Sequence, residues 1–247
     1  MARRDEILVY AADFLDLDAW PDYGPMGMQV IGAEEVRKIV CGVSASRELF
    51  ERAAAAGAQM VVVHHGILLD RDSRVVDARM KGRLQALFAA DLTLAGYHLA
   101  LDAHPVIGNN VLLARELGLS VEGRFGRIGQ GASLPEPLIL ESFVQRVSDR
   151  LRTTPLVFAE GPETIRRIAV NSGRSGHDLV LAATEGYDVL LTGEPEEGAL
   201  HTARELRINF VAAGHYATET LGVQALAKEL AERFALEWEF VDLPNPV

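Results

Sequence analysis

Two stretches of this sequence each consist of a short apolar run, then a histidine and, four residues later, a carboxylate. The side chains concerned are His98 with Asp102 and His215 with Glu219. Two neighbouring histidines, His64 and His65, also follow an apolar run. Imidazole nitrogens and carboxylate oxygens are ligands of divalent transition metals, so these six side chains together predict a metal centre. A lone histidine after a strand is more often a hydrogen-bonded structural residue, and the prediction therefore depends on the repeated spacing.

The pair His64 and His65 indicates a centre with two divalent ions. Successive residues of a regular strand point to opposite faces, but beyond the end of a strand the chain can turn and offer one imidazole to each ion. Asp102 and Glu219 are then the carboxylates that bridge or chelate the ions. This nitrogen and oxygen donor set suits Zn, Mn, Fe, Co or Ni better than Mg or Ca. Such ions lower the pKa of bound water to about 7, which favours hydrolysis of a small anionic substrate.

The chain resembles itself at a spacing of 129 residues, which indicates that repeated elements position these side chains. Among the corresponding pairs are Gly32 with Gly161, Ile39 with Ile168, and Gly57 with Gly186. In each half a β-branched run precedes Ser and Gly residues, an Ala-rich helical stretch, a Gly and a second apolar run, which is the pattern of a β-α-β unit. Beyond the second runs the spacing becomes 117, which pairs His98 with His215 and Asp102 with Glu219.

The repeat predicts an α/β protein of two similar domains, with mainly parallel strands flanked by helices. The second apolar runs, 60–63 and 189–191, are continuous, as in parallel strands that helices cover on both faces. We expect one domain over residues 1–125 and another over residues 126–247, with the C-terminal helix able to pack back on the first. The Gly-rich segment 123–131 is expected to be a connector or a short strand between the halves. Ligands of open α/β sheets bind beyond the carboxyl ends of strands, where the candidate histidines fall.

The composition of the 247-residue chain excludes several classes of protein. A formal net charge of -11 opposes nucleic-acid binding, because the Lys and Arg residues are scattered. The single cysteine, Cys41, excludes an intramolecular disulfide, and residues 1–6 lack the apolar core of a signal peptide. No apolar segment reaches the roughly 18 residues needed to span a bilayer. We therefore expect a compact cytoplasmic protein without a membrane span.

Further polar residues lie near these motifs, and each has a structural alternative. Glu194 follows the second parallel run and is either a base or outer ligand, or a carboxylate at a helix start. His104 either orients Asp102 or contacts substrate, or else lies in an exposed loop. Ser44 and Ser46 either line the pocket or cap the following helix, and capping is the role that we expect. Asn109 and Asn110 are expected to form a turn with an Asn helix cap.

Five motifs jointly resemble those of the Nif-three-like family of the YbgI type, also known as GTP cyclohydrolase 1 type 2 homologues. They are Gly27-Met28-Gln29-Val30, Val63-His64-His65-Gly66, the run from Tyr97 to Asn110, Leu191-Thr192-Gly193-Glu194, and the run from Ala212 to Glu219. These motifs span nearly the whole chain. The chain departs from the family at Leu99-Ala100, where Thr-Asn is usual, and at Ser44, where Asp is common. Both departures concern substrate contacts more than metal binding.

The resemblance implies a dinuclear metal site, two similar α/β domains and a ring-shaped homohexamer. Carried over residue by residue, the metal ligands that it implies are His64, His65, Asp102, His215 and Glu219. It places His98 beside these ligands, either as an additional ligand or in the shell around them.

The leading hypothesis is a metal-dependent hydrolase that acts on a nucleotide or a phosphate-bearing metabolite. For a GTP cyclohydrolase-like reaction, an activated water would attack the purine near C8, and His98 or Glu194 would move protons. The alternative is a non-catalytic binding or scaffold protein whose metals hold a large oligomer together. Both hypotheses imply that copies of the chain bind one another, and the first also implies a small anionic substrate.

Overall fold

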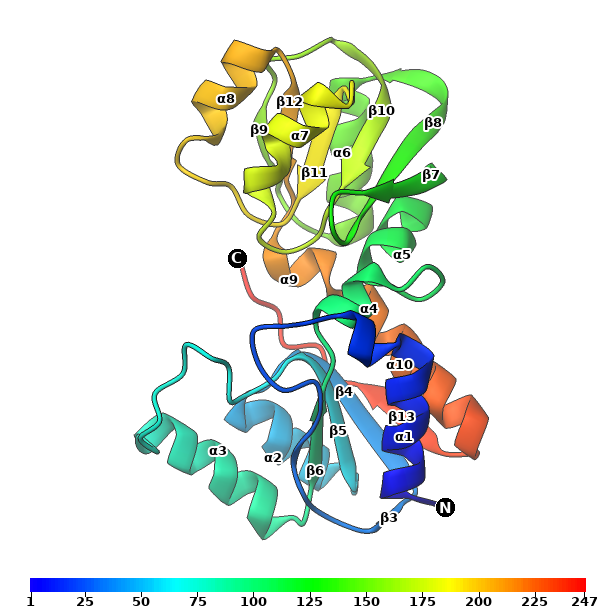
Figure 1. Cartoon of the computed structure of the whole chain (residues 1–247), viewed down its shortest axis with the longest axis vertical. Coiled ribbons are helices and arrows are strands. Elements are labelled where there is room, and N and C mark those ends of the chain that lie inside the picture. Colours follow the sequence, from blue (N-terminus) through cyan, green and yellow to red (C-terminus); the bar gives the residue numbers. More distant parts are fainter. The chain divides into compact units, whose positions relative to one another are not determined.

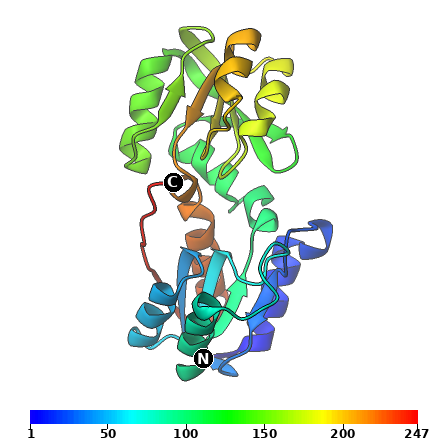
Figure 2. The same cartoon turned by 90° about the vertical axis from the view of Figure 1, so that its left-hand side faces the viewer.

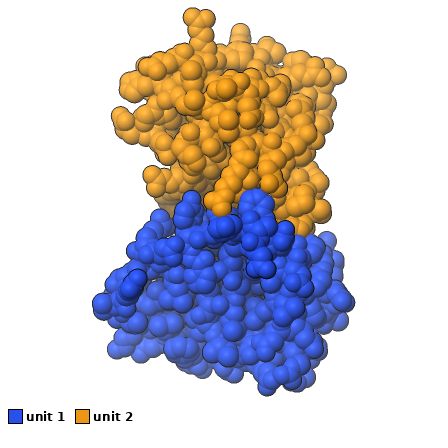
Figure 3. Space-filling view, in the orientation of Figure 1, with its two compact units in different colours: residues 1–101, 222–243 blue, residues 102–221, 244–247 orange.

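The computed structural model describes all residues, 1–247, which form two compact units (Figure 3). The first unit comprises Met1–Leu101 and Gly222–Leu243, and the second comprises Asp102–Leu221 and Pro244–Val247. The division after Leu101 falls earlier in the chain than the boundary expected from the sequence, between residues 125 and 126. None of the helices combines the length and the apolar character needed to cross a membrane. Helices flank mostly parallel strands, and the predicted α/β class is confirmed.

The first unit is built on a five-stranded sheet in the order β13-β4-β5-β6-β2 (Figure 1). Its strands are β2 (Gly27–Val30), β4 (Lys38–Ser44), β5 (Met60–His65), β6 (Thr93–Gly96) and β13 (Glu237–Phe240). β13, β4, β5 and β6 run parallel, and β2 is antiparallel to β6. A separate antiparallel pair joins β1 (Ala2–Arg3) to β3 (Glu35–Val36). The parallel strands therefore share one carboxyl edge, where His64 and His65 lie.

Helices cover both faces of this sheet. They are α1 (Arg4–Leu15), α2 (Arg47–Ala55), α3 (Ala78–Ala89) and α10 (Thr220–Phe234), with a 3-10 turn η1 (Leu17–Ala19). On one face, Val61 and Val63 belong to a buried cluster with Leu49 of α2 and Leu87 of α3. Figure 1 shows α1 and α10 on the opposite side, the side to which strand alternation turns Val62. Burial on both faces explains why β5 is continuously apolar up to its histidines.

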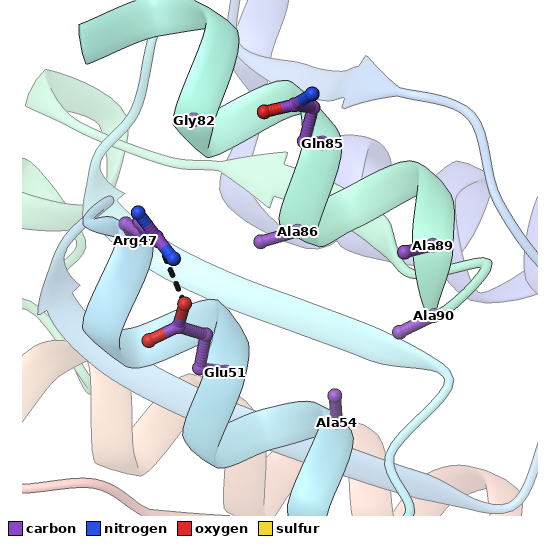
Figure 4. A pocket seen from close by; sticks show the side chains of 8 residues that line it. All are labelled: Arg47, Glu51, Ala54, Gly82, Gln85, Ala86, Ala89 and Ala90. Carbon is purple, nitrogen blue, oxygen red and sulfur yellow. Dashed lines mark hydrogen bonds and ion pairs between the residues drawn. The ribbon is translucent and has the colours of Figure 1, made fainter.

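A hollow of about 400 Å³ lies between α2 and α3 (Figure 4). Small side chains form much of its wall, among them Ala54, Ala86 and Ala89. Arg47 and Glu51 also line it, and Arg47 Nε lies 2.7 Å from Glu51 Oε1, so these two charges pair with each other. The hollow brings together no histidine and no pair of carboxylates, so it is not a candidate metal centre.

The second unit contains a six-stranded sheet in the order β7-β8-β10-β11-β12-β9. Its strands are β7 (Ser120–Phe125), β8 (Gly129–Ile139), β9 (Leu156–Phe158), β10 (Thr164–Val170), β11 (Val189–Thr192) and β12 (Asn209–Ala212). The central strands β10, β11 and β12 are parallel, whereas β7, β8 and β9 pair in antiparallel fashion. The Gly-rich segment 123–131 contains the turn of the β7 and β8 hairpin, so it lies within the second unit and is not a connector between units.

Helices also cover both faces of the second sheet. They are α5 (Asn109–Glu116), α6 (Leu140–Leu151), α7 (Leu179–Thr184), α8 (Ala199–Leu206) and α9 (His215–Thr218), with α4 (Leu99–Ala103) at the start of the unit and a 3-10 turn η2 (Gly176–Asp178). Ile168 of β10 is buried in a cluster with Leu113 of α5 and Phe143 of α6. Its neighbour Ala169 is buried in another cluster with Ala182 of α7. Figures 1 and 2 show α6 on one side of this sheet and α7 and α8 on the other.

The strand registers show the internal repeat directly. Ile39 of β4 lies opposite Met60 of β5, and Ile168 of β10 lies opposite Val189 of β11. β6 and β12 then extend the two parallel sets, and each pairs with an antiparallel edge strand, β2 or β9. The predicted duplication of a β-α-β unit is therefore present in both sheets.

Gly32 and Gly161 occupy corresponding close approaches in the two units. A Cβ on Gly32 would lie 2.6 Å from the carbonyl oxygen of Asp91, and a Cβ on Gly161 would lie 2.7 Å from the backbone nitrogen of Asn209. At each site the chain passes against the start of the strand that precedes a candidate histidine, β6 or β12. A larger residue would require the backbone to move.

Candidate metal centre

His64 and His65 are the last two residues of β5, at the carboxyl edge of the first sheet. His64 is fully buried, and the ring centroids of the two histidines are 4.6 Å apart. His98 follows the neighbouring strand β6, and its ring centroid lies 5.0 Å from that of His64 and 5.4 Å from that of His65. One donor nitrogen of each ring lies within 4.8 Å of a donor nitrogen of both others. The three imidazoles form one cluster within the first unit.

The Nδ1 atoms of His64 and His65 each lie within hydrogen-bond distance of an oxygen atom. His64 Nδ1 lies 2.9 Å from the carbonyl oxygen of Tyr97, and it donates because a carbonyl oxygen only accepts. His65 Nδ1 lies 3.2 Å from the hydroxyl oxygen of Ser44. Outer partners of this kind fix the tautomer and orientation of a metal-binding imidazole and direct Nε2 to the ion.

The two serines expected to cap a helix, Ser44 and Ser46, have different roles in the structure. Ser46 is the N-cap of α2, where its hydroxyl oxygen accepts the N–H of Leu49 at 3.2 Å, as predicted. Ser44 is instead the last residue of β4 and lies opposite His65 in the strand register. The strand pairing therefore makes Ser44 a partner of a candidate ligand rather than a cap.

His98 is held by Asp22, a residue that the sequence motifs did not single out. Asp22 Oδ1 lies 2.8 Å from His98 Nδ1, and Asp22 Oδ2 accepts the N–H of Leu99 at 2.8 Å. Only 3% of the Asp22 side chain is exposed. Burial acts to raise the pKa of this carboxyl, but His98 and two backbone N–H groups hold the pKa below its usual value.

Gln29 of β2 packs beneath the loop that follows the histidine pair. Its Oε1 accepts the N–H of Ile67 at 2.7 Å. A Cβ on Gly66 would lie 2.6 Å from the Gln29 Cδ atom, and a Cβ on Gly96 would lie 2.8 Å from its Nε2. The Gln29 amide thus fills the space that these two glycines leave, and it fixes the chain just beyond His65.

In the second unit, Asp102 is 2% exposed, and amide and hydroxyl groups surround it. Asn109 Nδ2 donates to Asp102 Oδ1 at 2.8 Å, and Ser172 Oγ lies 3.4 Å from the same oxygen. Asn110 Nδ2 lies 3.4 Å from the Asp102 carbonyl oxygen, and Asn110 Oδ1 accepts the N–H of Ser172 at 2.7 Å. The expectation that the two asparagines cap a helix is wrong, because Gly108 is the N-cap of α5 and both amides hold Asp102 and its surroundings.

His215 is the first residue of α9, and carboxylates approach both of its ring nitrogens. Nε2 lies 3.1 Å from Glu219 Oε2, and Nδ1 contacts Glu194 Oε1. The Glu219 side chain is 3% exposed. Burial acts to lower the pKa of His215, but the two carboxylates outweigh it and raise the pKa to about 9.

The other two open expectations concern Glu194 and His104. Glu194 does not start a helix, because α8 begins only at Ala199, and its carboxylate instead meets the ring of His215. His104 Nδ1 accepts two backbone N–H groups of the turn that follows it, at 3.2 and 3.1 Å. Glu194 therefore lies at the candidate centre, and the ring of His104 stabilises its own turn.

The loop of residues 171–176, after β10, lies against His215 and Glu219. Gly173 has a φ of +62, and a Cβ there would overlap Glu219 Oε1 and lie 3.2 Å from His215 Nε2. The N–H of Gly173 donates to Thr218 Oγ1 at 3.1 Å. The next residue, Arg174, is exposed, and no acidic side chain pairs with it. This loop brings bare backbone against the Glu219 carboxylate and carries an exposed cation at the next residue.

The residues present fit divalent transition ions. The three imidazoles of the first unit form a group able to hold an ion, and the oxygen atoms on Nδ1 leave Nε2 as the donor. In the second unit, Asp102 and Glu219 are buried carboxylates, which are costly to bury unless cations or hydrogen bonds compensate them. Together with His215, these donors suit Zn, Mn, Fe, Co or Ni.

The duplicated fold and this set of donors define a family of α/β proteins with candidate metal-binding residues. The sequence pattern of the family described as Duf34/NIF3 (NGG1p interacting factor 3) matches residues 2–246, so the chain belongs to this family. The resemblance to Nif-three-like proteins of the YbgI type is thereby confirmed.

Particular relatives support the same assignment. A protein from Pseudomonas aeruginosa named GTP cyclohydrolase 1 type 2 homolog is 44% identical over 245 residues, which cover 97% of each chain. A protein of the same name from Escherichia coli K12 is 41% identical over 233 residues, which cover 94% of each chain. Among solved structures, protein ybgI, described as of unknown function, has a TM-score of 0.97 and 39% identity over the full length of both chains. A protein from Thermus thermophilus has a TM-score of 0.92 and 34% identity over the same extent.

Proposed function

We propose that this protein is a metal-dependent hydrolase that acts on a nucleotide or a phosphate-bearing metabolite. The proposed metal ligands, shared by two divalent ions, are His64, His65, Asp102, His215 and Glu219. The observation that carries the proposal is the histidine cluster of the first unit, in which an oxygen atom holds each Nδ1. Such uniform outer contacts are typical of imidazoles that present Nε2 to an ion or a reacting group.

Two divalent ions at this centre would supply a water activated at neutral pH and more positive charge than two carboxylates cancel. Within that setting, His98 is proposed to accept a proton at Nε2 and to return it to the leaving group. Glu194 is proposed to hold the ring of His215 through Nδ1 and to take part in proton transfer beside it. Both residues are therefore proposed as catalytic.

Arg174 supports an anionic substrate. It is exposed on the loop that packs against Glu219, and no acidic side chain neutralises it. In a chain with a net charge of -11, an exposed and unpaired guanidinium on a loop that contacts candidate ligands suits recognition of a phosphate group. The relatives named GTP cyclohydrolase 1 type 2 homolog make GTP the first nucleotide to examine.

We further propose that the chain assembles into a homohexameric ring and works in the cytoplasm. The family resemblance suggests the ring, and the single buried cysteine, Cys41, fits a reducing compartment. The acidic net charge argues against nucleic acid as a partner. Light scattering on the purified protein should give the mass of six chains, and the mass of a monomer would contradict the ring.

A second candidate function is a non-catalytic scaffold in which the same ions hold an oligomer together. The burial of Asp102 and Glu219 favours it as a rival, because buried carboxylates bound to metal also serve purely structural sites. The two candidate functions predict different results for a variant that lacks one metal ligand: loss of turnover for the hydrolase and loss of the oligomer for the scaffold.

Glu219→Ala separates the two functions, with Glu232→Ala, which removes an exposed carboxylate of α10, as the control. Metal content, oligomer mass and turnover of GTP, other nucleotides and phosphate esters are measured for all three proteins. Metal analysis of the unaltered protein should give two ions per chain. Turnover that disappears in Glu219→Ala while the oligomer stays intact supports the hydrolase. An inactive unaltered protein whose Glu219→Ala variant dissociates contradicts the hydrolase and supports the scaffold.

A further inference from the structure

We propose that Asp22 is a positioning residue that fixes the tautomer and ring orientation of His98, so that Nε2 of His98 is an acceptor facing the histidine cluster. The proposal deepens the proposed function, because it states how His98 is prepared for proton transfer at that centre. The contact between Asp22 and His98 can be tested without any turnover.

The geometry of Asp22 ties the ring to the backbone beside it. Asp22 lies in the segment between η1 and β2, and its two oxygens have different partners. Oδ1 lies 2.8 Å from His98 Nδ1, and Oδ2 accepts the N–H of Leu99 at 2.8 Å. Because one carboxylate holds the ring of residue 98 and the backbone of residue 99, a rotation of the His98 ring would break the first contact while the second stays in place.

Burial makes this arrangement specific. The Asp22 side chain is 3% exposed and the His98 side chain 28% exposed, so water competes little for the carboxylate. An ionised carboxylate has lone pairs but no proton, and it can only accept hydrogen bonds. The hydrogen between Asp22 and His98 therefore lies on Nδ1, which leaves the lone pair of the neutral ring on Nε2.

The Nδ1 partners of the neighbouring histidines differ from that of His98. A backbone carbonyl, that of Tyr97, sets the tautomer of His64, whereas the hydroxyl of Ser44 beside His65 can either donate or accept. Within the cluster, Asp22 is the side chain that sets a tautomer through an acceptor-only group. The His98 ring lies 5.0 Å from the His64 ring, so its Nε2 is the nitrogen available to that cluster.

The test compares Asp22→Asn with the unaltered full-length protein by nitrogen NMR of histidine-labelled, zinc-loaded samples, with His98→Gln to assign the ring signals. In the unaltered protein we expect a protonated Nδ1 and an unprotonated Nε2. In Asp22→Asn the amide oxygen can keep the N–H of Leu99 while the amide N–H₂ donates to His98 Nδ1, so we expect the tautomer to reverse. Asp18→Asn, which removes an exposed carboxylate from the preceding turn η1, should leave the signals unchanged.

The outcomes decide the proposal separately from the proposed function. Unchanged His98 signals in Asp22→Asn, or an Nε2–H tautomer in the unaltered protein, would overturn it even if the protein hydrolyses GTP. If a substrate is found, Asp22→Asn should lower kcat by about 10- to 100-fold with metal content and KM nearly unchanged, and adding His98→Gln should lower it no further. A loss of kcat that is additive with that of His98→Gln would mean that Asp22 acts on the fold and not through His98.

Discussion

His215 lies between two carboxylates, with Nε2 3.1 Å from Glu219 Oε2 and Nδ1 in contact with Glu194. Burial alone would lower the pKa of this imidazole, but the two acidic neighbours raise it to about 9. In the metal-free protein the ring is therefore positively charged at neutral pH, and a metal ion binding to it must displace a proton.

The first prediction concerns the stability of the metal-free protein against pH. Because the folded-state pKa of His215 exceeds its ordinary value of 6.5, the folded protein binds this proton more tightly than the unfolded chain does. The resulting stabilisation is complete below pH 6.5 and is lost as pH rises through about 9. Urea unfolding of the metal-free protein, measured with a chelator at intervals across this pH range, should show the free energy of unfolding falling as pH rises. The free energy of unfolding of His215→Gln should change less with pH. An equally steep fall in that variant would show that His215 is not the group responsible.

A methyl group at Gly173 should damage the second unit in two ways. Gly173→Ala must hold a left-handed backbone and also overlap Glu219 Oε1, so it should lose both stability and metal affinity. Gly57→Ala is the matched control, because Gly57 has a similar φ of +70 and nothing lies within 4 Å of its added Cβ. The control should lose about 1–2 kcal/mol of unfolding free energy. Equal losses in the two variants, with metal affinity unchanged, would show that the Glu219 contact is unimportant.

The thiol of Cys41 should be inert in the folded protein. Its side chain is fully buried in β4, and burial raises its pKa to about 12, so the reactive thiolate is scarce at pH 8. Mass spectrometry after treatment with iodoacetamide should find Cys41 unlabelled in the native protein and fully labelled in urea. Labelling at equal rates in both conditions would show that the first sheet opens readily.

Arg174 should determine affinity for a phosphate-bearing substrate. Arg174→Gln removes an exposed, unpaired cation from the loop that contacts Glu219 and changes no proposed ligand, so metal content should stay the same while KM rises about 10-fold or more. Arg166→Gln, at an exposed arginine of β10, serves as the control and should change neither quantity. If KM is unchanged in Arg174→Gln, the anionic group of the substrate is recognised elsewhere.

The elements that carry the candidate ligands can be predicted from periodicity and spacing. The apolar run before His64 is a buried parallel strand, and its counterpart in the second half, β11, pairs in the same register. Local chemistry also identifies Ser46 as the cap of α2. These features depend on neighbouring residues, so the sequence pattern contains them.

Contacts between distant segments could not be predicted in the same way. Asp22 meets His98 across 76 residues, and Ser172 meets Asp102 across 70, without any periodic signal. Because glycine usually marks loops, the Gly-rich segment 123–131 predicts a connector or a short strand between the halves. Gly131 instead lies in β8, and it is a glycine because a side chain there would overlap the hydroxyl of Tyr187.

The edge strand β13 of the first sheet follows residues 102–221 of the second unit in the chain. β13 pairs in parallel with β4, where Lys38 Nζ lies 2.6 Å from Glu239 Oε2 across 201 residues of sequence. A nascent chain must therefore complete residues 102–221, the main part of the second unit, before this edge of the first sheet can close. A fragment ending at Leu101 would lack both β13 and α10, so no single cut of the backbone releases either unit whole.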